Sequence, residues 1–269
     1  MAEVQVNGIE LYVEEHGSGE PLLLIEGLGY ASWSWFQQVE EFAQHYRTII
    51  FDNRGVGDSD KPDEPYSIEL LAQDAAGILS ALGINSAHVL GVSMGGYIAQ
   101  QMAITYPHFV RSLVLSCTSC GGSNSLPITQ EALDSMLNVS GLTPQEVIRQ
   151  GLSVAFNKQF LESHLDLVEK MVLLRMEKPT PRYAWERQFA AARSFDIESK
   201  LTKIEVPTLI LTGLDDHVLP SQNSFLLAER IPGAKLVTIP DAGHLFFIEK
   251  FEEYNRLVLN FLQNLSSGK

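Results

Sequence analysis

The sequence predicts an α/β fold in which a mostly parallel sheet of about eight strands, starting antiparallel, is flanked by helices and carries a helical cap insertion. Three observations support this prediction. Short apolar runs alternate with longer amphipathic segments along most of the chain. A serine flanked by glycines stands at a strand-to-helix junction at residues 91–95. A long interval with no strand-like run separates residues 119 and 207.

The N-terminal part of the chain predicts two strands joined by a hairpin. Leu11 to Glu15 and Pro21 to Glu26 are strand-like, and the turn His16-Gly17-Ser18-Gly19 lies between them. Glycines between two strand-like runs are typical of a hairpin. We therefore expect these two strands to pair with each other and the sheet to start antiparallel.

The rest of the core is expected to consist of βα units. The clearest helix is Ser67 to Leu82, which has one apolar face, Ser67 as its N-cap and Gly83 at its end. The last helix has a similar apolar stripe over residues 254–262, and we expect both stripes to pack in the core. The expected strands are Thr48 to Phe51, Ala87 to Val92, Leu113 to Ser116, Thr208 to Leu211 and Lys235 to Ile239.

The strandless interval predicts a cap. We divide the chain into a core domain of residues 1–121 and 196–269 and a helical insertion of residues 122–195. Insertions at the C-terminal edge of a parallel sheet cover the crevice where such folds bind ligands, so the cap should shape a substrate pocket. The expected cap helices are Pro144 to Asn157, Leu161 to Met176 and Arg182 to Arg193.

Composition limits the class of protein. A chain of 269 residues with 45% hydrophobic residues can form one substantial core. A net charge of -14 argues against a nucleic-acid partner, which needs clustered Lys and Arg. No apolar run approaches the ~20 residues that span a bilayer, and the N-terminus lacks the pattern of a signal peptide. We expect a cytoplasmic protein with a small-molecule substrate and no membrane partner; its oligomeric state is left open.

The segment Gly91-Val92-Ser93-Met94-Gly95 is typical of a nucleophile elbow. A serine on such a sharp turn has strained backbone angles, so the residues two before and two after it must be small. Gly91 and Gly95 meet this requirement. We expect Ser93 to be a nucleophile and the backbone N–H of Met94, at the start of the following helix, to face a developing oxyanion.

A serine nucleophile needs a general base, and the position of His244 fits this role. It follows the last predicted strand, so it should lie at the same edge of the sheet as Ser93. His88 lies within a predicted strand and is expected to be structural, whereas His45 and His108 should cap helices or face solvent. The acid that orients the base should lie on a neighbouring loop, and both Asp215 and Asp216 follow the strand-like run of residues 207–213.

Two further motifs are interpreted as structural. Cys117 and Cys120 form a C-x-x-C, but Gly121-Gly122-Ser123 follows instead of a helix, and two more zinc ligands at suitable spacing are missing. The glycine-rich loop of residues 54–57 lacks the third glycine of a dinucleotide site, because Asp60 occupies that position. We therefore expect no redox, metal or dinucleotide role for these motifs.

Four segments together resemble the α/β-hydrolase fold superfamily, over nearly the whole chain. In that family the acid lies three residues after the glycine and four before the proline, which implies Asp216 rather than Asp215. The resemblance thus implies a triad of Ser93, Asp216 and His244. The segments are Gly91-Val92-Ser93-Met94-Gly95-Gly96, Phe51-Asp52-Asn53-Arg54-Gly55-Val56-Gly57-Asp58-Ser59, Gly213-Leu214-Asp215-Asp216-His217-Val218-Leu219-Pro220 and Gly243-His244.

The chain departs from the family at Glu26-Gly27-Leu28-Gly29, where the family usually has His-Gly after its third strand. The second oxyanion donor is a main-chain N–H, which we assign to Leu28, and a changed neighbouring side chain leaves that amide in place. We expect Glu26 to form an ion pair in a structural network. The alternative is that it lies near the pocket and disfavours anionic substrates.

These residues predict a serine hydrolase that cleaves a small carboxylic ester through an acyl-enzyme, with no cofactor and no metal. The serine argues against the dehalogenases and epoxide hydrolases of this fold, which have an aspartate nucleophile. Enol-lactone hydrolysis and carbon-carbon bond hydrolysis use the same triad and stay as alternatives. A carboxylated lactone would need a cationic cap residue, for which Arg182, Arg187 and Arg193 are available. A ligand-binding or regulatory protein with little turnover is the third alternative.

Overall fold

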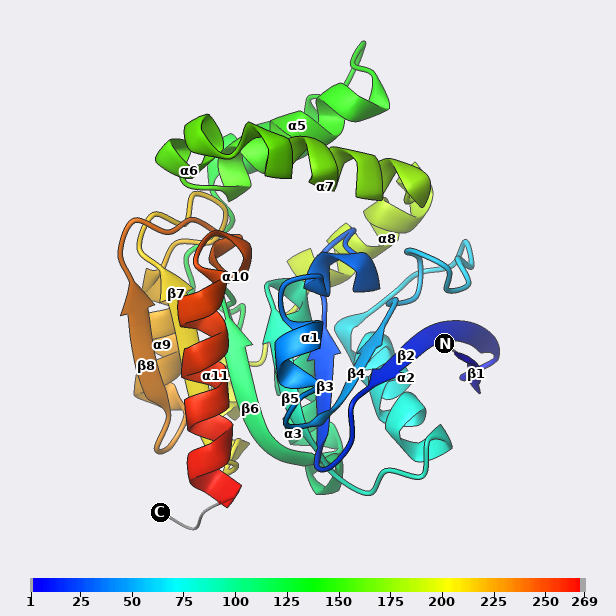
Figure 1. Cartoon of the computed structure of the whole chain (residues 1–269), viewed down its shortest axis with the longest axis vertical. Coiled ribbons are helices and arrows are strands. Elements are labelled where there is room, and N and C mark those ends of the chain that lie inside the picture. The colour runs from blue at the N-terminus through cyan, green and yellow to red at the C-terminus, as the bar shows by residue number, and fades with distance from the viewer. Residues whose placement is uncertain (1, 267–269) are drawn as a thin grey trace.

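The computed structural model describes residues 2–266, in which eight strands form one sheet with helices on both faces (Figure 1). The strand order is β1-β2-β4-β3-β5-β6-β7-β8. β1 and β2 are antiparallel to their neighbours, and all later pairs are parallel. The predicted α/β fold with an antiparallel start is therefore confirmed. The strands are β1 (Ala2–Val6), β2 (Ile9–His16), β3 (Pro21–Ile25), β4 (Arg47–Phe51), β5 (Ala87–Val92), β6 (Val110–Ser116), β7 (Thr208–Gly213) and β8 (Lys235–Ile239).

The partner of β2 differs from the prediction. β2 pairs with β1 and β4, whereas β3 lies between β4 and β5, so the predicted hairpin between β2 and β3 was wrong. The hairpin turn of the sheet is Asn7-Gly8, where both residues have positive φ, as a tight two-residue turn requires. Gly17 also has positive φ, but its backbone passes against Ala43 and Tyr46 and leads the chain away to a non-adjacent strand.

Helices cover both faces of the sheet. α2, α3 and α9 pack on one face, and α1 and α11 pack on the other. α2 begins where predicted, because the Ser67 side chain accepts a hydrogen bond from the Leu70 N–H at 3.1 Å, and Gly83 follows its end with a φ of 68°. The core helices are α1 (Val39–Phe42), α2 (Ile68–Ala81), α3 (Met94–Thr105), α9 (Gln222–Arg230), α10 (Phe246–Glu249) and α11 (Phe251–Ser266).

The interval between β6 and β7 is helical and lies over the C-terminal ends of the parallel strands (Figure 1). The stretch predicted as one helix over residues 161–176 is interrupted at His164, and the helix α4 had not been predicted. The cap boundaries at residues 122 and 195 stay a prediction, and beside them an isolated bridge joins Gly121 to Asp196. The helices are α4 (Gln130–Leu137), α5 (Pro144–Ala155), α6 (Lys158–Ser163), α7 (Leu165–Glu177) and α8 (Arg182–Arg193).

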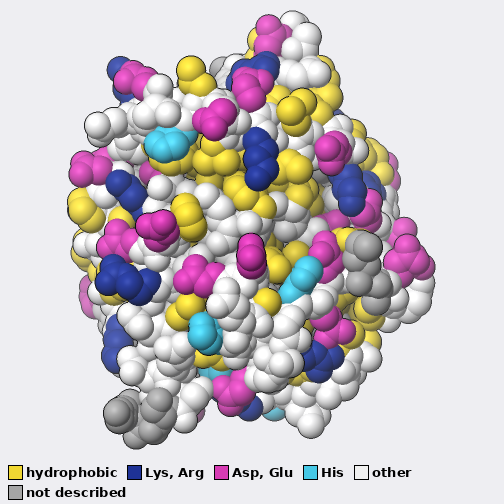
Figure 2. Space-filling model, viewed as in Figure 1, with side chains coloured by type: hydrophobic (Ala, Val, Ile, Leu, Met, Phe, Trp, Pro, Cys, Tyr) yellow, Lys and Arg dark blue, Asp and Glu magenta, His cyan; other side chains and the backbone are white. Residues whose placement is uncertain are grey.

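The surface of the molecule is mixed in character. On the face shown in Figure 2, hydrophobic side chains gather where the cap meets the core, whereas charged side chains are scattered over the rest. Within residues 2–266, none of the helices combines the length and the apolar character needed to cross a bilayer.

Candidate active site

Ser93 lies between β5 and α3 in a strained backbone conformation, with φ 53° and ψ -120°. Residues with side chains rarely adopt positive φ, and such strain concentrates at functional sites. The turn is so tight that a Cβ at Gly91 would overlap the Gly95 carbonyl, and a Cβ at Gly95 would overlap the Ile25 carbonyl. The turn therefore requires glycine at both positions. Ser93 is partly exposed and lines the cavity below the cap.

Two backbone N–H groups beside this cavity are available to a ligand. Met94 is the first residue of α3, so its N–H has no acceptor within the helix. In the loop after β3, the N–H groups of Gly27 and Gly29 are both bonded to side chains. The N–H of Leu28, between them, has no acceptor within the described residues 2–266. The two amides predicted to bind an oxyanion thus line the same cavity.

Asp216 and His244 are hydrogen-bonded to each other at the C-terminal edge of the sheet. Asp216 Oδ2 lies 2.7 Å from His244 Nδ1, and both side chains are nearly fully buried. The other oxygen, Oδ1, accepts the N–H groups of Val218 and Leu219, both at 2.8 Å. Because a carboxylate only accepts hydrogen bonds, Nδ1 carries the proton and Nε2 is left as an acceptor.

The neighbouring Asp215 has a different partner. Its Oδ2 accepts a hydrogen bond from Asn157 Nδ2 at 2.9 Å, at the start of the cap helix α6. Of the two carboxylates that the residues alone left open, the one that contacts His244 is Asp216. Asp215 instead ties the cap to the core.

Glu249 supports the histidine loop, a role that the sequence did not reveal. Its carboxylate accepts the N–H of Gly243 at 3.0 Å and the N–H of Asn157 at 2.7 Å. Burial raises the pKa of Glu249 above its ordinary value. The residue before His244 and the first turn of α6 are therefore held by one buried carboxyl group. No local pattern marks this role, because both contacts form only in the folded chain.

Glu26 lies at the cavity and is 1% exposed. It accepts hydrogen bonds from the Ser34 hydroxyl and, at 3.0 Å, from the Gly27 N–H. The expected ion pair was wrong, because Glu26 has no basic partner within ion-pair distance among residues 2–266. Without a compensating cation, burial raises the pKa of Glu26 to about 7.

The cavity has a volume of about 610 Å³ and is lined by both the core and the cap. That size is typical of small-molecule sites. Its wall is largely apolar, with side chains such as Leu133, Ile148 and Phe189 from the cap and Leu219 and Phe247 from the core. Most of the wall is therefore suited to contact with apolar groups.

Three arginines of the cap line the cavity, and one of them was not predicted. Arg182 and Arg193 lie at the wall, but Arg187 does not, because it pairs with Asp63 at 3.0 Å. The third is Arg175, whose guanidinium lies over the Tyr30 ring at 4.9 Å. Within the described part of the chain, Arg175 has no carboxylate at ion-pair distance.

The residues interpreted as structural are buried, and one of them, Cys117, also lines the cavity. Cys117 and Cys120 are both free and buried, and burial raises the pKa of each thiol. His88 is buried in β5, where its Nδ1 lies 2.7 Å from the Ser112 hydroxyl. Arg54, in the glycine-rich loop, is buried and bonded to a carboxylate.

A sheet of this order, with a serine on the turn after β5 and a carboxylate–histidine pair after β7 and β8, defines the α/β-hydrolase class of protein. The chain belongs to the alpha/beta hydrolase fold family, whose model matches residues 20–251.

Similar proteins have several activities. A poly(3-hydroxyalkanoate) depolymerase of Ectopseudomonas oleovorans is 34% identical over 244 residues, which cover 90% of this chain and 84% of the relative. A 2-hydroxymuconate semialdehyde hydrolase of Pseudomonas sp. strain CF600 is 32% identical over 274 residues, covering 97% and 93%. The solved enol-lactonase of Burkholderia xenovorans LB400 superimposes with a TM-score of 0.86 at 25% identity, covering 97% of this chain and all of the other. The protein is thus a hydrolase by family.

Proposed function

We propose that this protein is a serine hydrolase that cleaves small carboxylic esters, with Ser93 as nucleophile, His244 as general base and Asp216 as the acid that orients the base. The observation that carries the proposal is the 2.7 Å hydrogen bond between Asp216 and His244, at the cavity that Ser93 also lines. This arrangement combines a nucleophile, a base and an orienting group in one concave site.

The reaction follows from these positions. His244 Nε2 takes the proton of the Ser93 hydroxyl as Oγ attacks the ester carbonyl carbon, and the N–H groups of Leu28 and Met94 stabilise the oxyanion. The protonated histidine then gives its proton to the leaving alcohol, which leaves an acyl group on Ser93. A water molecule, deprotonated by His244, attacks this acyl group and releases the acid and the free serine. These steps use only side chains and amides of this chain.

The cavity is evidence that the acyl or alcohol group of the substrate is small and apolar. Its volume of about 610 Å³ fits a small molecule, and its wall is largely hydrophobic. The relative named as a poly(3-hydroxyalkanoate) depolymerase acts on a polymer whose units are joined by esters, which agrees with ester cleavage by this chain.

A second candidate is hydrolysis of a lactone or a carbon-carbon bond in a substrate that carries a carboxylate. Arg175 favours it, because a guanidinium at the cavity wall without an acidic partner can bind a carboxylate. Relatives named as an enol-lactonase and a semialdehyde hydrolase agree with this candidate. Glu26 opposes it when ionised, since it adds a negative charge to the same wall.

Hydrolysis of a chain-length series of p-nitrophenyl esters and of a simple enol-lactone, by wild type and Ser93→Ala, tests the proposal. We expect multiple turnovers of short esters by the wild type and on the order of 10³ to 10⁶ lower kcat in the variant. Turnover of the lactone alone would favour the second candidate. No turnover by folded wild type would overturn the enzyme proposal and favour a ligand-binding protein.

A further inference from the structure

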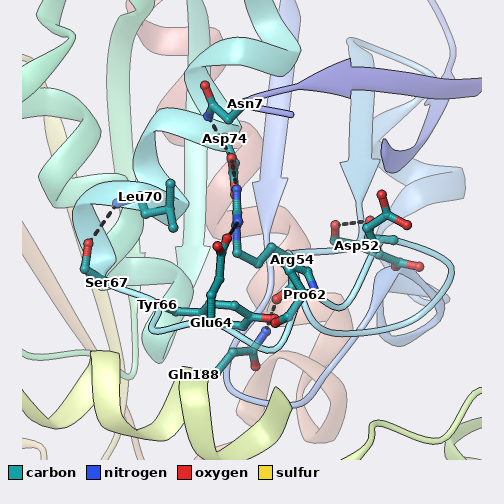
Figure 3. Close-up of polar contacts among 12 residues, drawn as sticks. Asn7, Asp52, Arg54, Pro62, Glu64, Tyr66, Ser67, Leu70, Asp74 and Gln188 are labelled. Atoms are coloured by element: carbon teal, nitrogen blue, oxygen red, sulfur yellow. Dashed lines mark hydrogen bonds and ion pairs between the residues drawn. The ribbon is translucent and has the colours of Figure 1, made fainter. Parts of the chain in front are cut away.

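Gln188 of the cap helix α8 is fully buried and connects two loops of the core. Figure 3 shows it beside one of them, the loop of Arg54. Its Oε1 accepts the N–H of Gly29 at 2.9 Å, and its Nε2 donates to the carbonyl of Arg54 at 2.9 Å. One amide thus meets a donor at its oxygen and an acceptor at its nitrogen. A flipped amide would place like groups against each other, so this orientation is specified by the two partners.

The position of the Arg54 carbonyl is fixed, because the Arg54 side chain is buried and bonded in the core. The Arg54 guanidinium forms two hydrogen bonds to Asp74, at 2.7 and 2.9 Å, and both side chains are 1% exposed. Asn7, in the turn between β1 and β2, donates to the same carboxylate at 2.7 Å. Figure 3 shows this series of contacts running from Asn7 through Asp74 and Arg54 towards Gln188.

The other partner, Gly29, follows Leu28, which lines the same cavity as Ser93 and whose N–H has no acceptor among residues 2–266. The loop around Leu28 is held on one side by Glu26, which accepts the Gly27 N–H at 3.0 Å, and on the other side by Gln188. The first contact belongs to the core, whereas the second belongs to the cap. The two peptide groups on either side of Leu28 are therefore held by different parts of the chain, one by the core and one by the cap.

Cap side chains also pack directly on this loop. A Cβ at Gly29, where φ is 71°, would lie 2.9 Å from Trp185 and 3.1 Å from Arg175. Gly29 therefore sits directly beneath α7 and α8, and Gln188 is the cap residue that adds a hydrogen bond to that packing.

We propose that Gln188 is a positioning residue that aligns the Leu28 N–H with the substrate oxyanion, so that seating of the cap helix α8 on the core completes the oxyanion hole. The inference rests on the proposed acyl transfer at Ser93. Gln188 touches no reacting atom and acts through Gly29. Removing an oxyanion donor outright costs about 10² to 10³ in kcat, and a donor that is retained but misaligned should cost part of that.

The first test is Gln188→Met, which keeps the length of the side chain and removes both hydrogen bonds. With a short p-nitrophenyl ester we expect kcat to fall about 10- to 100-fold while KM changes less than about threefold, because the amide acts on the transition state. Tyr183→Phe is the matched control. It removes another hydrogen bond from α8 to the core, from the Tyr183 hydroxyl to the Lys61 carbonyl at 2.8 Å, and should leave kcat unchanged.

The second test is Gln188→Glu, measured as the ratio of its kcat to that of the wild type between pH 8 and pH 5.5. A protonated carboxyl both accepts from Gly29 and donates to the Arg54 carbonyl, whereas an ionised one cannot donate. The ratio should therefore rise as the pH falls. A flat ratio, or equal kcat values for Gln188→Met, Tyr183→Phe and wild type, overturns the inference. Inactive folded wild type overturns the proposed function itself.

Discussion

Asp216 Oδ2 lies 2.7 Å from His244 Nδ1, although the two residues are 28 positions apart in the chain. The adjacent carboxylate, Asp215, faces the cap and binds Asn157. These two consecutive acidic residues therefore have different partners. In the turn after β7, Asp216 contacts the histidine and Asp215 contacts the cap.

The two aspartates should respond differently to the same substitution. Asp216→Asn should lower kcat about 10⁴-fold, because an amide does not hold the histidine in the tautomer that leaves Nε2 as an acceptor. Asp215→Asn removes a charge but keeps an oxygen for Asn157, so kcat should stay within about threefold of wild type. Steady-state ester hydrolysis by both variants measures this, and a larger loss in Asp215→Asn would contradict the assignment.

The strained backbone at Ser93 should lower the free energy of unfolding, and substitutions at this position should reveal the effect. Ser93→Ala keeps a Cβ at φ 53°, whereas Ser93→Gly relieves the strain, which is worth on the order of 1 to 3 kcal/mol. Glycine loses more backbone entropy on folding, so Ser93→Gly should exceed Ser93→Ala by about 1 kcal/mol in the free energy of unfolding. Urea denaturation measures the difference.

A helical serine supplies the matched control for this comparison. Ser80 is exposed in α2, where glycine is about 1 kcal/mol less favourable than alanine. Ser80→Gly should therefore be less stable than Ser80→Ala, the opposite order to that at Ser93. The same order at both positions would show that the turn is not strained.

Glu26 should make stability depend on pH. Its pKa in the folded protein is raised by burial to about 7 from an ordinary 4.5. Between these values the folded protein holds a proton that the unfolded chain has released, so the free energy of unfolding falls as the pH rises, by on the order of 3 kcal/mol in all. In Glu26→Gln the side chain does not titrate, so this contribution to the pH dependence of the free energy of unfolding is absent.

The stability of Glu26→Gln relative to wild type should therefore increase from pH 4.5 to about 7 and level off above it. Urea denaturation of both proteins across this range measures the difference, in which the contributions of other titrating groups cancel. A difference that is independent of pH would show that folding does not raise the pKa of this carboxyl group.

The anchor of Arg54 should be costly to break. Asp74→Asn leaves a guanidinium that is 1% exposed without its buried carboxylate, and the loss of one partner of a buried pair costs about 3 to 5 kcal/mol. Glu15→Gln breaks the pair between Glu15 and Arg47, whose side chains are about one-third exposed, and should cost less than about 1 kcal/mol. Equal losses in the two variants would contradict the role of Asp74.

Features written in short segments could be predicted from the sequence. The turn at Ser93 requires glycines two positions on either side, and the cap of α2 requires Ser67, so both leave a local pattern. The parallel strands that follow are buried and appear as apolar runs. The position of His244 followed from strand order, because successive parallel strands end at the same edge of the sheet.

Features that depend on distant contacts could not be predicted. The pairing of β2 is decided by β1 and β4 rather than by the glycines that follow β2. In the sequence Gln188 and Arg175 have no distinguishing pattern. Only the fold of the cap places them beside the loop after β3. The partners of Glu26 are hydroxyl and amide groups that no charge pattern reveals.

Reaction of the wild type with a fluorophosphonate, followed by intact-mass and peptide analysis, tests the central claim most directly. The reagent phosphonylates an activated serine with loss of fluoride, which needs the nucleophile, the base and the oxyanion donors together. We predict one adduct, located on Ser93, which is absent in Ser93→Ala and forms much more slowly in Asp216→Asn. An unmodified Ser93 in folded wild type, or an adduct on another residue, would contradict the account.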